Sequence, residues 1–376
     1  MSLFLLFFLL FFLLSLIVYV SFVVWILFGL RKLNTPQKQG ASGTPTISVV
    51  IAARNEAEHI AQCLHALTLQ THAPLELIII DDASEDETSH IVQAQPISNL
   101  RLLRNETPIG KKPSLAKGIA CAKGEIIACT DADCLVPPTW LEEIATSFRE
   151  ESLGFLSMPV VYHNEKNLFE QCQSLDFLAL VAIGGALIKL GRPAICNGAN
   201  IAYRRTLFFQ TGGFGKIKLA SGDDEAVMRN IFKIGYNVEF LATERATVKT
   251  VPVRTLRNFF KQRIRWASKG TAYSDVSFLF LLALALIYAF NLMLLLSPLW
   301  AWLSGLWHIA FASVLIKFSV DFLAIWHITK AFHRTALRRV FLAAEFLQIV
   351  YVALTPLLAE LFKLGKGYEW KGVNRK

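Results

Sequence analysis

Charge is missing from the start of the chain. Residues 3–30 contain no Asp, Glu, Lys or Arg and consist mainly of Leu, Phe, Val and Ile. About 20 apolar residues in a helix span the hydrocarbon core of a bilayer. This apolar run therefore predicts a transmembrane anchor over residues 1–33. No basic residue precedes the run, which is about twice as long as a signal-peptide core, so a retained helix is favoured over a cleaved signal. Arg31 and Lys32 follow it, and the positive-inside bias places the next domain in the cytosol.

Paired cysteines are also missing. The six cysteines include no Cys-x-x-Cys pair, which predicts a reducing compartment and argues against a cysteine-bound metal. The net charge is +9, but many basic residues flank apolar segments, where anionic lipid head groups are the nearest partner. We therefore expect a membrane partner and no nucleic acid.

The apolar residues fall in two blocks. The chain has 376 residues, of which 54% are hydrophobic, too many for one soluble domain of average composition. A second apolar block begins near residue 278 and continues almost to residue 362. We therefore predict the anchor, a cytosolic domain over residues 44–273, and a C-terminal membrane block with a basic tail over residues 274–376.

The C-terminal block leaves its topology open. Two spans are predicted at residues 278–302 and 305–326, and a third apolar segment covers residues 340–362, with Glu345, Pro356 and Glu360 inside it. If all three segments cross, the basic tail ends outside, against the positive-inside bias. Either the last segment is re-entrant or the tail departs from the rule.

Strand and helix patterns alternate in the cytosolic domain. An apolar strand over residues 46–53, a helix over 56–70 and a second strand over 75–80 predict a βαβ unit with parallel strands. The alternation continues with a helix at 85–93, a strand at 100–103, a helix from 113 and a strand at 125–129. This pattern predicts an open, mostly parallel α/β sheet, in which ligands bind beyond the carboxyl ends of the strands.

Acidic residues stand at those strand ends. Asp81 and Asp82 close the second strand, and Asp131 and Asp133 follow the strand at 125–129. Two carboxylates in an Asp-x-Asp sequence can share a hard divalent cation that also binds phosphate oxygens. The alternatives are a strand-end turn or helix cap for Asp82 and a plain loop pair for the other two.

Five segments in this order resemble the family 2 glycosyltransferases of the GT-A fold, which has a Rossmann-like nucleotide-binding half. They are residues 48–56, 79–84, 131–133, 221–225 and 262–266. The last is similar to the Gln-x-x-Arg-Trp motif of membrane-bound polysaccharide synthases and glycolipid glycosyltransferases. The resemblance extends over about residues 46–270.

The resemblance implies a set of donor-binding residues. Asp82 would accept a hydrogen bond from the nucleobase, and Lys111 would face the diphosphate as a point charge. Asp133, with Asp131, would hold Mg²⁺ or Mn²⁺ against that diphosphate. The full set implied at the donor comprises Ala53, Asn55, Glu56, Asp82, Lys111, Asp131 and Asp133.

The resemblance also implies a general base. The family usually shows Glu-Asp in this cluster with the Asp as base, so Asp224 is the expected catalytic residue and Asp223 its neighbour. Because this chain has Asp-Asp-Glu there, Glu225 leaves the register open. The alternative is that Asp223 merely caps the helix that begins at residue 225.

A basic amphipathic helix is predicted over residues 252–270, where helical spacing puts apolar side chains on one face and basic ones on another. The resemblance implies that it faces the acceptor or the diphosphate through Gln262, Arg263, Arg265 and Trp266. A lipid anchor without a catalytic part fits the periodicity equally well. Asn200 is implied beside the acceptor, and residues 176–190 predict an interfacial or core helix.

Together these features imply an inverting, metal-dependent glycosyltransferase in a bacterial inner membrane, multi-pass, with a cytosolic catalytic domain. The donor would be a nucleotide-diphospho sugar linked to uridine, and the acceptor a lipid or a polyprenyl-linked glycan. Residues 369–372 resemble a Trp-Lys-Gly ending of some lipid-directed members, which argues for a cytosolic tail. The alternatives are a processive polysaccharide synthase, a non-catalytic membrane scaffold and a nucleotidyltransferase.

Overall fold

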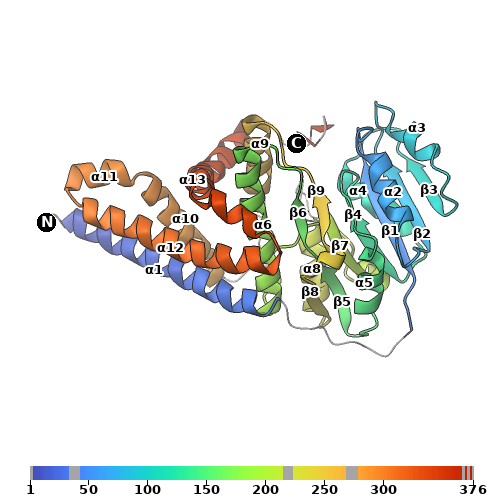
Figure 1. Cartoon of the computed structure of the whole chain (residues 1–376), viewed down its shortest axis with the longest axis horizontal. Coiled ribbons are helices and arrows are strands. Elements are labelled where there is room, and N and C mark those ends of the chain that lie inside the picture. The colour runs from blue at the N-terminus through green and yellow to red at the C-terminus, as the bar shows by residue number, and fades with distance from the viewer. Residues whose placement is uncertain are drawn as a thin grey trace. The chain divides into compact units, whose positions relative to one another are not determined.

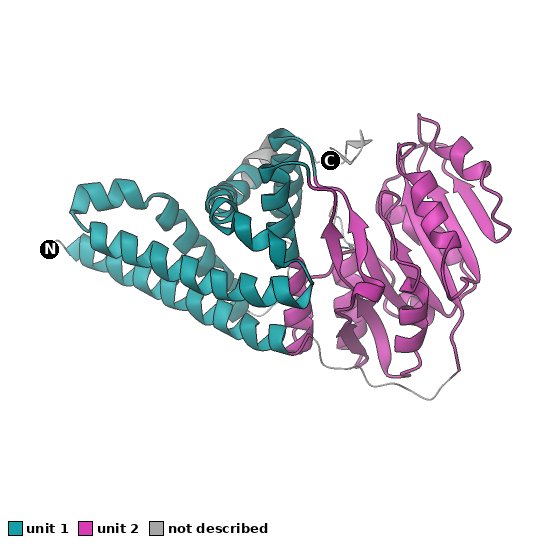
Figure 2. Cartoon of the chain, viewed as in Figure 1, with its two compact units in different colours: residues 1–31, 166–179, 253–366 teal, residues 32–165, 180–252, 367–376 magenta. Residues whose placement is uncertain are grey.

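The computed structural model of the chain describes residues 3–33, 43–214, 223–267, 278–365, 369–370 and 373–374. The chain divides into two compact units, which Figure 2 shows in different colours. Unit 1 comprises Met1–Arg31, Lys166–Ala179 and Val253–Lys366, and unit 2 comprises Lys32–Glu165, Leu180–Pro252 and Gly367–Lys376. The predicted cytosolic domain therefore contributes two segments to unit 1.

Unit 2 is built on a seven-stranded sheet in the order β3-β2-β1-β4-β7-β5-β8 (Figure 1). Strands β3, β2, β1 and β4 are parallel, β7 is antiparallel to both its neighbours, and β8 is parallel to β5. The α/β class and the open, mostly parallel sheet are therefore confirmed. The strands are β1 (Ile47–Ala53), β2 (Glu76–Asp81), β3 (Leu100–Arg104), β4 (Ile126–Thr130), β5 (Leu153–Ser157), β7 (Asn200–Arg204) and β8 (Asn237–Phe240).

Helices and a small second sheet complete unit 2. Strand β6 (Val160–Tyr162) pairs in parallel with β9 (Val248–Thr250). The helices of this unit are α2 (Ile60–Thr68), α3 (Thr88–Gln93), α4 (Lys111–Cys121), α5 (Trp140–Ser147), α7 (Arg205–Gln210), α8 (Asp223–Lys233) and the 3-10 turn η1 (Glu244–Ala246). The helix predicted from residue 56 thus begins at Ile60.

The interior of this sheet explains why its apolar runs form strands. Every residue of β1, β2 and β4 is buried, as expected of parallel strands that helices cover on both faces. Helix α4 packs closely on them through Gly118, where an added Cβ would lie 2.8 Å from Val50 Cγ1. The close packing holds α4 against β1 and β2.

Unit 1 is helical. Its helices are α1 (Leu3–Arg31), α9 (Leu256–Ala267), α10 (Phe278–Leu295), α11 (Ser297–Ser304), α12 (Trp307–Ala331), the 3-10 turn η3 (Thr335–Val340) and α13 (Phe341–Gly365). Helix α6 (Leu168–Lys189) begins in unit 1 and ends in unit 2. The span predicted over residues 278–302 is divided, because α10 ends at Leu295 and Pro298 opens α11.

Within the described residues, five helical segments are long and apolar enough to cross a membrane. They are Leu3–Arg31, Leu168–Lys189, Phe278–Leu295, Trp307–Ala331 and Thr335–Ala359. The segment Leu168–Lys189 is 78% buried inside the protein over its most apolar stretch, against 17–44% for the other four. Protein side chains therefore cover α6 far more completely than the others.

Candidate active site

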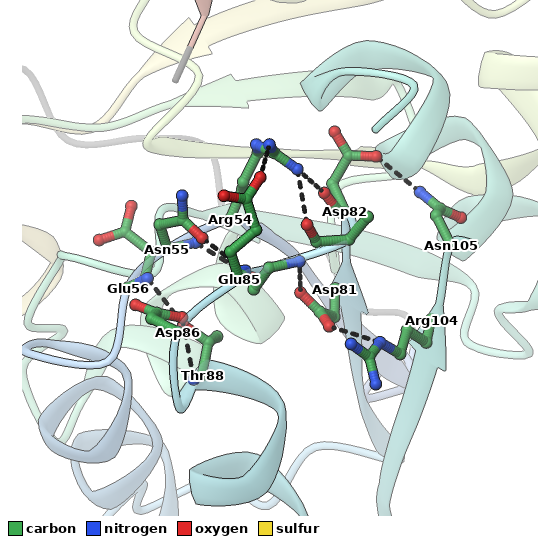
Figure 3. A network of polar contacts seen from close by, with 12 residues as sticks. Arg54, Asn55, Glu56, Asp81, Asp82, Glu85, Asp86, Thr88, Arg104 and Asn105 are labelled. Carbon is green, nitrogen blue, oxygen red and sulfur yellow. Dashed lines mark hydrogen bonds and ion pairs between the residues drawn. The ribbon is translucent and has the colours of Figure 1, made fainter. Parts of the chain in front are cut away.

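The side chain of Arg54 connects the loops that follow β1 and β2 (Figure 3). The Arg54 side chain is only 4% exposed, and its Nη1 donates to the backbone oxygens of Asp82 and Ala83, each at 2.7 Å. Its Nη2 lies 3.1 Å from Oε1 of Glu85. Ala83 has a φ of 54°, a left-handed conformation that costs a non-glycine residue about 1–2 kcal/mol. The arginine therefore holds a strained turn at the end of β2.

Three residues predicted to bind the donor lie at the end of β1 and in the loop that follows it. Ala53 ends β1 and is buried. Asn55 has a φ of 52°; its backbone N–H donates to Ser84 Oγ, and its Oδ1 accepts from the N–H of Glu85. The backbone N–H of Glu56 donates to Thr88 Oγ1 at 2.8 Å. These bonds fix the loop that approaches the carboxyl edge of the sheet.

Asp82 is completely buried and its carboxylate is engaged on both oxygens. It accepts four hydrogen bonds, from Asn105 Nδ2, Ser114 Oγ, Ile109 N and Gly110 N, at 2.7–3.1 Å. Gly110 has a φ of 94°, which only glycine adopts without strain. The carboxylate thus positions the segment that leads into Lys111. A contact with the nucleobase stays a prediction.

Asp131 and Asp133 follow β4, with Lys111 beside them. The Lys111 Nζ lies 2.5 Å from Asp131 Oδ1, and both side chains are about one third exposed, 33% and 32%. Cys134 Sγ lies 3.6 Å from Asp133 Oδ1. A cation and carboxylates therefore stand together at the edge of the sheet, within reach of solvent.

The buried thiol of Cys63 on α2 shows that the ends of β1 and β4 converge. Burial raises the pKa of Cys63, and the nearby charges of Asp133, Asp131 and Glu56 raise it further. Its sulfur also lies 3.7 Å from the backbone oxygen of Asp131. The charges of three carboxylates predicted at the donor, from two separate motifs, thus act on one sulfur.

Asp224 lies in the first turn of α8, beside the loop that enters β7. A Cβ added at Gly198 would lie 2.9 Å from its Oδ2. Two residues later Asn200 pairs with Thr130, the last residue of β4, directly before Asp131. The sheet register therefore brings the predicted base to the strand end that carries the Asp-x-Asp pair. The side chain of Asp223 lies outside the described residues.

Asn200 is completely buried. Its Oδ1 accepts from Trp140 Nε1 at 2.8 Å, and its Nδ2 donates to the backbone oxygens of Pro159 and Ala246 at 2.7 and 2.8 Å. Both amide hydrogens are therefore used inside the protein. This burial favours a positioning role for Asn200 over the contact with the acceptor that the sequence predicts.

The residues at the end of β4 fit a divalent metal ion. Magnesium is commonly bound through one or two carboxylates together with substrate phosphates and water. Asp131 and Asp133 supply such hard oxygen ligands, and Asp131 reaches solvent. The described residues contain no group of three or more His, Cys, Asp or Glu able to hold a metal. A cation bound here would therefore take its remaining ligands from a diphosphate and from water.

The Gln-x-x-Arg-Trp segment lies in the second half of α9, in unit 1. The Arg263 side chain is 3% exposed and forms an ion pair with Asp176. Its Cζ lies 4.3 Å from the centre of the Trp266 ring and 4.7 Å from that of Phe259. This burial favours a structural role for Arg263 over the predicted contact with acceptor or diphosphate. Gln262 and Arg265 are partly exposed, and their roles stay predictions.

Sequence reasoning missed four residues of this arrangement. Arg54 lies inside a quoted motif and Gly198 inside the loop before Asn200, so both could have been singled out. Ser114 and Asp176 had no signal, because their partners are 32 and 87 positions away.

Known proteins are similar to this chain. Residues 48–210 match the model of the family described as Glycosyl transferase family 2. The chain is 27% identical to a beta-monoglucosyldiacylglycerol synthase of Trichormus variabilis over 62% of this chain and 51% of that protein. It is 23% identical to a poly-beta-1,6-N-acetyl-D-glucosamine synthase of Staphylococcus epidermidis over 67% of this chain and 60% of that protein. The chain thus spans about half to three fifths of these relatives.

A solved structure supports the fold. It is a mannosyltransferase of Pyrobaculum calidifontis in complex with GDP-Man and Mn²⁺. The TM-score is 0.57 at 20% identity, over 90% of this chain and 99% of that one. The predicted GT-A type of sheet is therefore confirmed.

Proposed function

Because residues 48–210 match the model of Glycosyl transferase family 2, we propose that the chain is an inverting glycosyltransferase. It moves a sugar from a uridine-linked diphospho sugar to a lipid or polyprenyl-linked acceptor at the cytosolic face of a bacterial inner membrane. One observation carries the proposal: Asp224 lies beside Gly198, two residues before the point where β7 pairs with the end of β4. A carboxylate is thereby available near the strand end that carries Asp131 and Asp133.

The chemistry assigned to Asp224 is general base catalysis. Its carboxylate takes the proton from the acceptor hydroxyl while that oxygen attacks the anomeric carbon, opposite the leaving diphosphate. A single displacement of this kind inverts the configuration at that carbon. A positioned base typically contributes 10²–10⁴-fold to the rate.

The leaving diphosphate needs positive charge. Asp131 and Asp133 would hold Mg²⁺ or Mn²⁺, which neutralises charge on the leaving group when bound. Lys111 pairs with Asp131 and adds a cation of its own at the same strand end. The Mn²⁺ in the mannosyltransferase complex supports this assignment.

The acceptor is assigned from the membrane unit. The candidate spans and the basic helix α9 support a location at a bilayer, where a lipid-linked acceptor would be available. The relatives include both a glycolipid synthase and a polysaccharide synthase. We favour the glycolipid class because the C-terminal membrane block is modest for a polymer channel. A processive synthase is the second candidate.

The test uses the full chain, purified in detergent and returned to lipid vesicles. It is incubated with a panel of uridine-linked sugars and Mn²⁺, and nucleotide release and lipid products are measured. We expect release of UDP with one donor and a lipid that carries a single sugar with inverted configuration. A long polymer would support the second candidate, and no transfer with any donor would support a non-catalytic scaffold.

A further inference from the structure

We propose that Asp176 is a positioning residue for sugar transfer, which fixes the rotation of α9 about its own axis. The direction in which Gln262, Arg265 and Trp266 point then depends on a carboxylate 86 or more positions before them in the sequence. The catalytic consequence of this inference rests on the proposed function. The structural part, that Asp176 fixes the rotation of α9, does not depend on the proposed function.

The carboxylate of Asp176 is bonded from two directions. Nη2 of Arg263 donates to its Oδ2, and the hydroxyl of Tyr351 donates to its Oδ1. The Asp176 and Arg263 side chains are 5% and 3% exposed. The first part of α6, which belongs to unit 1, thus meets α9 and α13 at one buried charge pair.

Aromatic rings surround the guanidinium of Arg263. The centre of the Tyr351 ring lies 5.4 Å from its Cζ, in addition to the rings of Phe259 and Trp266 on α9 itself. Phe259 packs edge-on against Tyr351, and Trp266 stacks on Phe177 of α6 at 5.9 Å. Cation–π contacts of this kind strengthen when they are desolvated. The buried side of α9 is therefore specific in shape as well as in charge.

Without Asp176, burial of this side of α9 would place the charge of Arg263 inside the protein without its ion-pair partner. Arg263 shares the buried side with Phe259 and Ile264, whereas Arg257, Lys261 and Arg265 lie on other sides of the helix. Adjacent residues are about 100° apart around a helix. A change that buries Arg265 in place of Arg263 would therefore turn α9 by about 160° and redirect Gln262 and Trp266.

Removing one partner of a buried charge pair leaves the other charge uncompensated. This strongly destabilises the folded state if the remaining charge stays buried. In Asp176→Asn the neutral amide keeps the size of the side chain and still accepts one hydrogen bond. Arg263 loses its counter-charge, and α9 is free to present another face. We expect kcat/KM for the acceptor to fall and nucleotide binding in unit 2 to be unaffected.

Asp321 provides a matched control in the same unit. It is a buried carboxylate that pairs with a lysine, Lys317, and accepts a hydrogen bond from a tyrosine, Tyr19, but it contacts no residue of α9 in any described hydrogen bond or ion pair. Asp321→Asn therefore removes a buried carboxylate elsewhere in unit 1, where Lys317 keeps its ion pair with Glu345.

The kinetic test compares Asp176→Asn, Asp176→Glu and Asp321→Asn in the full chain in lipid vesicles. We expect Asp176→Asn to lower kcat/KM for the acceptor at least tenfold, Asp176→Glu to restore part of the loss, and UDP affinity to change less than twofold. An equal loss in Asp321→Asn, or no loss in Asp176→Asn, would overturn the proposal.

A second readout does not require activity. Single cysteines replace Lys261, which is exposed, or Ile264, which is 8% exposed, in a background where the partly exposed Cys121 and Cys196 are serine. We expect a maleimide to label position 261 at least tenfold faster than 264, and Asp176→Asn to remove most of that difference. An unchanged ratio overturns the positioning role. If Asp176→Asn removes the difference in labelling rate but the wild-type chain transfers no sugar, only the proposed function is refuted.

Discussion

A Cβ atom at Gly198 would lie 2.9 Å from Oδ2 of Asp224. Carbon and oxygen atoms that are not bonded do not approach so closely, and the carboxylate is the freer of the two groups. An added methyl group would therefore displace the Asp224 side chain and leave the backbone of the loop in place. The absence of a side chain at position 198 gives Asp224 its room.

Gly198→Ala should therefore lower activity without unfolding the protein. We expect kcat to fall about 10–100-fold, because a shift of about 1 Å in a catalytic group has effects of this size. The thermal midpoint should stay within a few degrees of the wild type. Gly43→Ala is the control, since a Cβ at Gly43 meets nothing within 4 Å. Unchanged kcat in Gly198→Ala would show that Asp224 is not the base.

Asp224→Asn and Asp223→Asn together distinguish Asp224 from Asp223 as the base. We expect Asp224→Asn to lower kcat by about 10²–10⁴-fold with UDP affinity unchanged, because an amide cannot accept the proton. Asp223→Asn should retain most of the activity. Rates are measured as nucleotide release under saturating donor. A larger loss of kcat in Asp223→Asn than in Asp224→Asn would assign the base to Asp223.

Much of the sheet could be predicted from the sequence, because its apolar runs are short and end in turn residues. The strand ends carrying Asp82 and Asp131 followed from that pattern, since parallel strands share one carboxyl edge. The same logic missed what each carboxylate does there. Asp82 is engaged by backbone N–H groups of the segment before α4, a contact that depends on how a loop folds and not on strand periodicity.

Pairs between distant helices were beyond prediction. Helical spacing indicated that α9 is amphipathic, with a basic face that does not include Arg263, but it could not indicate that Asp176 and Tyr351 bind that residue on the buried side. Asn200 is similar: its motif suggested a binding loop, whereas its amide bonds to Trp140 and two backbone oxygens. Periodicity describes a helix or strand by itself and contains no information about its partner.

Removal of divalent metal should abolish transfer. We expect EDTA to stop nucleotide release and added Mn²⁺ or Mg²⁺ to restore it, because Asp131 and Asp133 fit a cation that is completed by the diphosphate. Asp133→Asn should raise the Mn²⁺ concentration for half-maximal rate about tenfold or more. Glu106→Gln, an exposed change in the same unit, serves as the control. Full activity in EDTA would contradict the metal assignment.

Glu76 should make unit 2 sensitive to acid. Burial raises the pKa of Glu76, but bonds from the Lys123 N–H, the Ser48 hydroxyl and the Arg101 guanidinium outweigh it, so the net pKa is lowered. The folded state therefore gains stability from this carboxylate above its unfolded pKa of about 4.3. That gain is lost as the pH falls through the lower folded pKa.

Glu76→Gln should remove about 1–3 kcal/mol of stability at pH 7, because Arg101 and the Lys123 N–H lose a charged acceptor. The variant should also lose less stability than the wild type on acidification. Urea unfolding of the full chain in detergent, followed from pH 7 down to about pH 3, measures both effects. Equal acid sensitivity of the variant and the wild type would show that Glu76 is not the responsible group.

The polar cluster between α1, α12 and α13 should hold unit 1 together. Lys317 is completely buried, and its Nζ lies 2.6 Å from both Asp321 Oδ2 and Glu345 Oε2; Tyr19 donates to Asp321 at 2.6 Å. Charged groups among membrane-spanning helices are costly unless paired. Lys317→Met leaves two carboxylates without their cation, so it should destabilise more than Asp321→Asn, which keeps one ion pair.

Neutralising the whole cluster should restore part of the loss, because apolar or neutral replacements of a buried ion pair are often tolerated. We expect the triple variant Lys317→Met, Asp321→Asn, Glu345→Gln to be more heat-stable in detergent than Lys317→Met alone. Lys330→Met, an exposed lysine near the end of α12, should leave the midpoint of thermal aggregation unchanged. If the triple variant were no more stable than Lys317→Met, uncompensated charge would not be the cause of the loss.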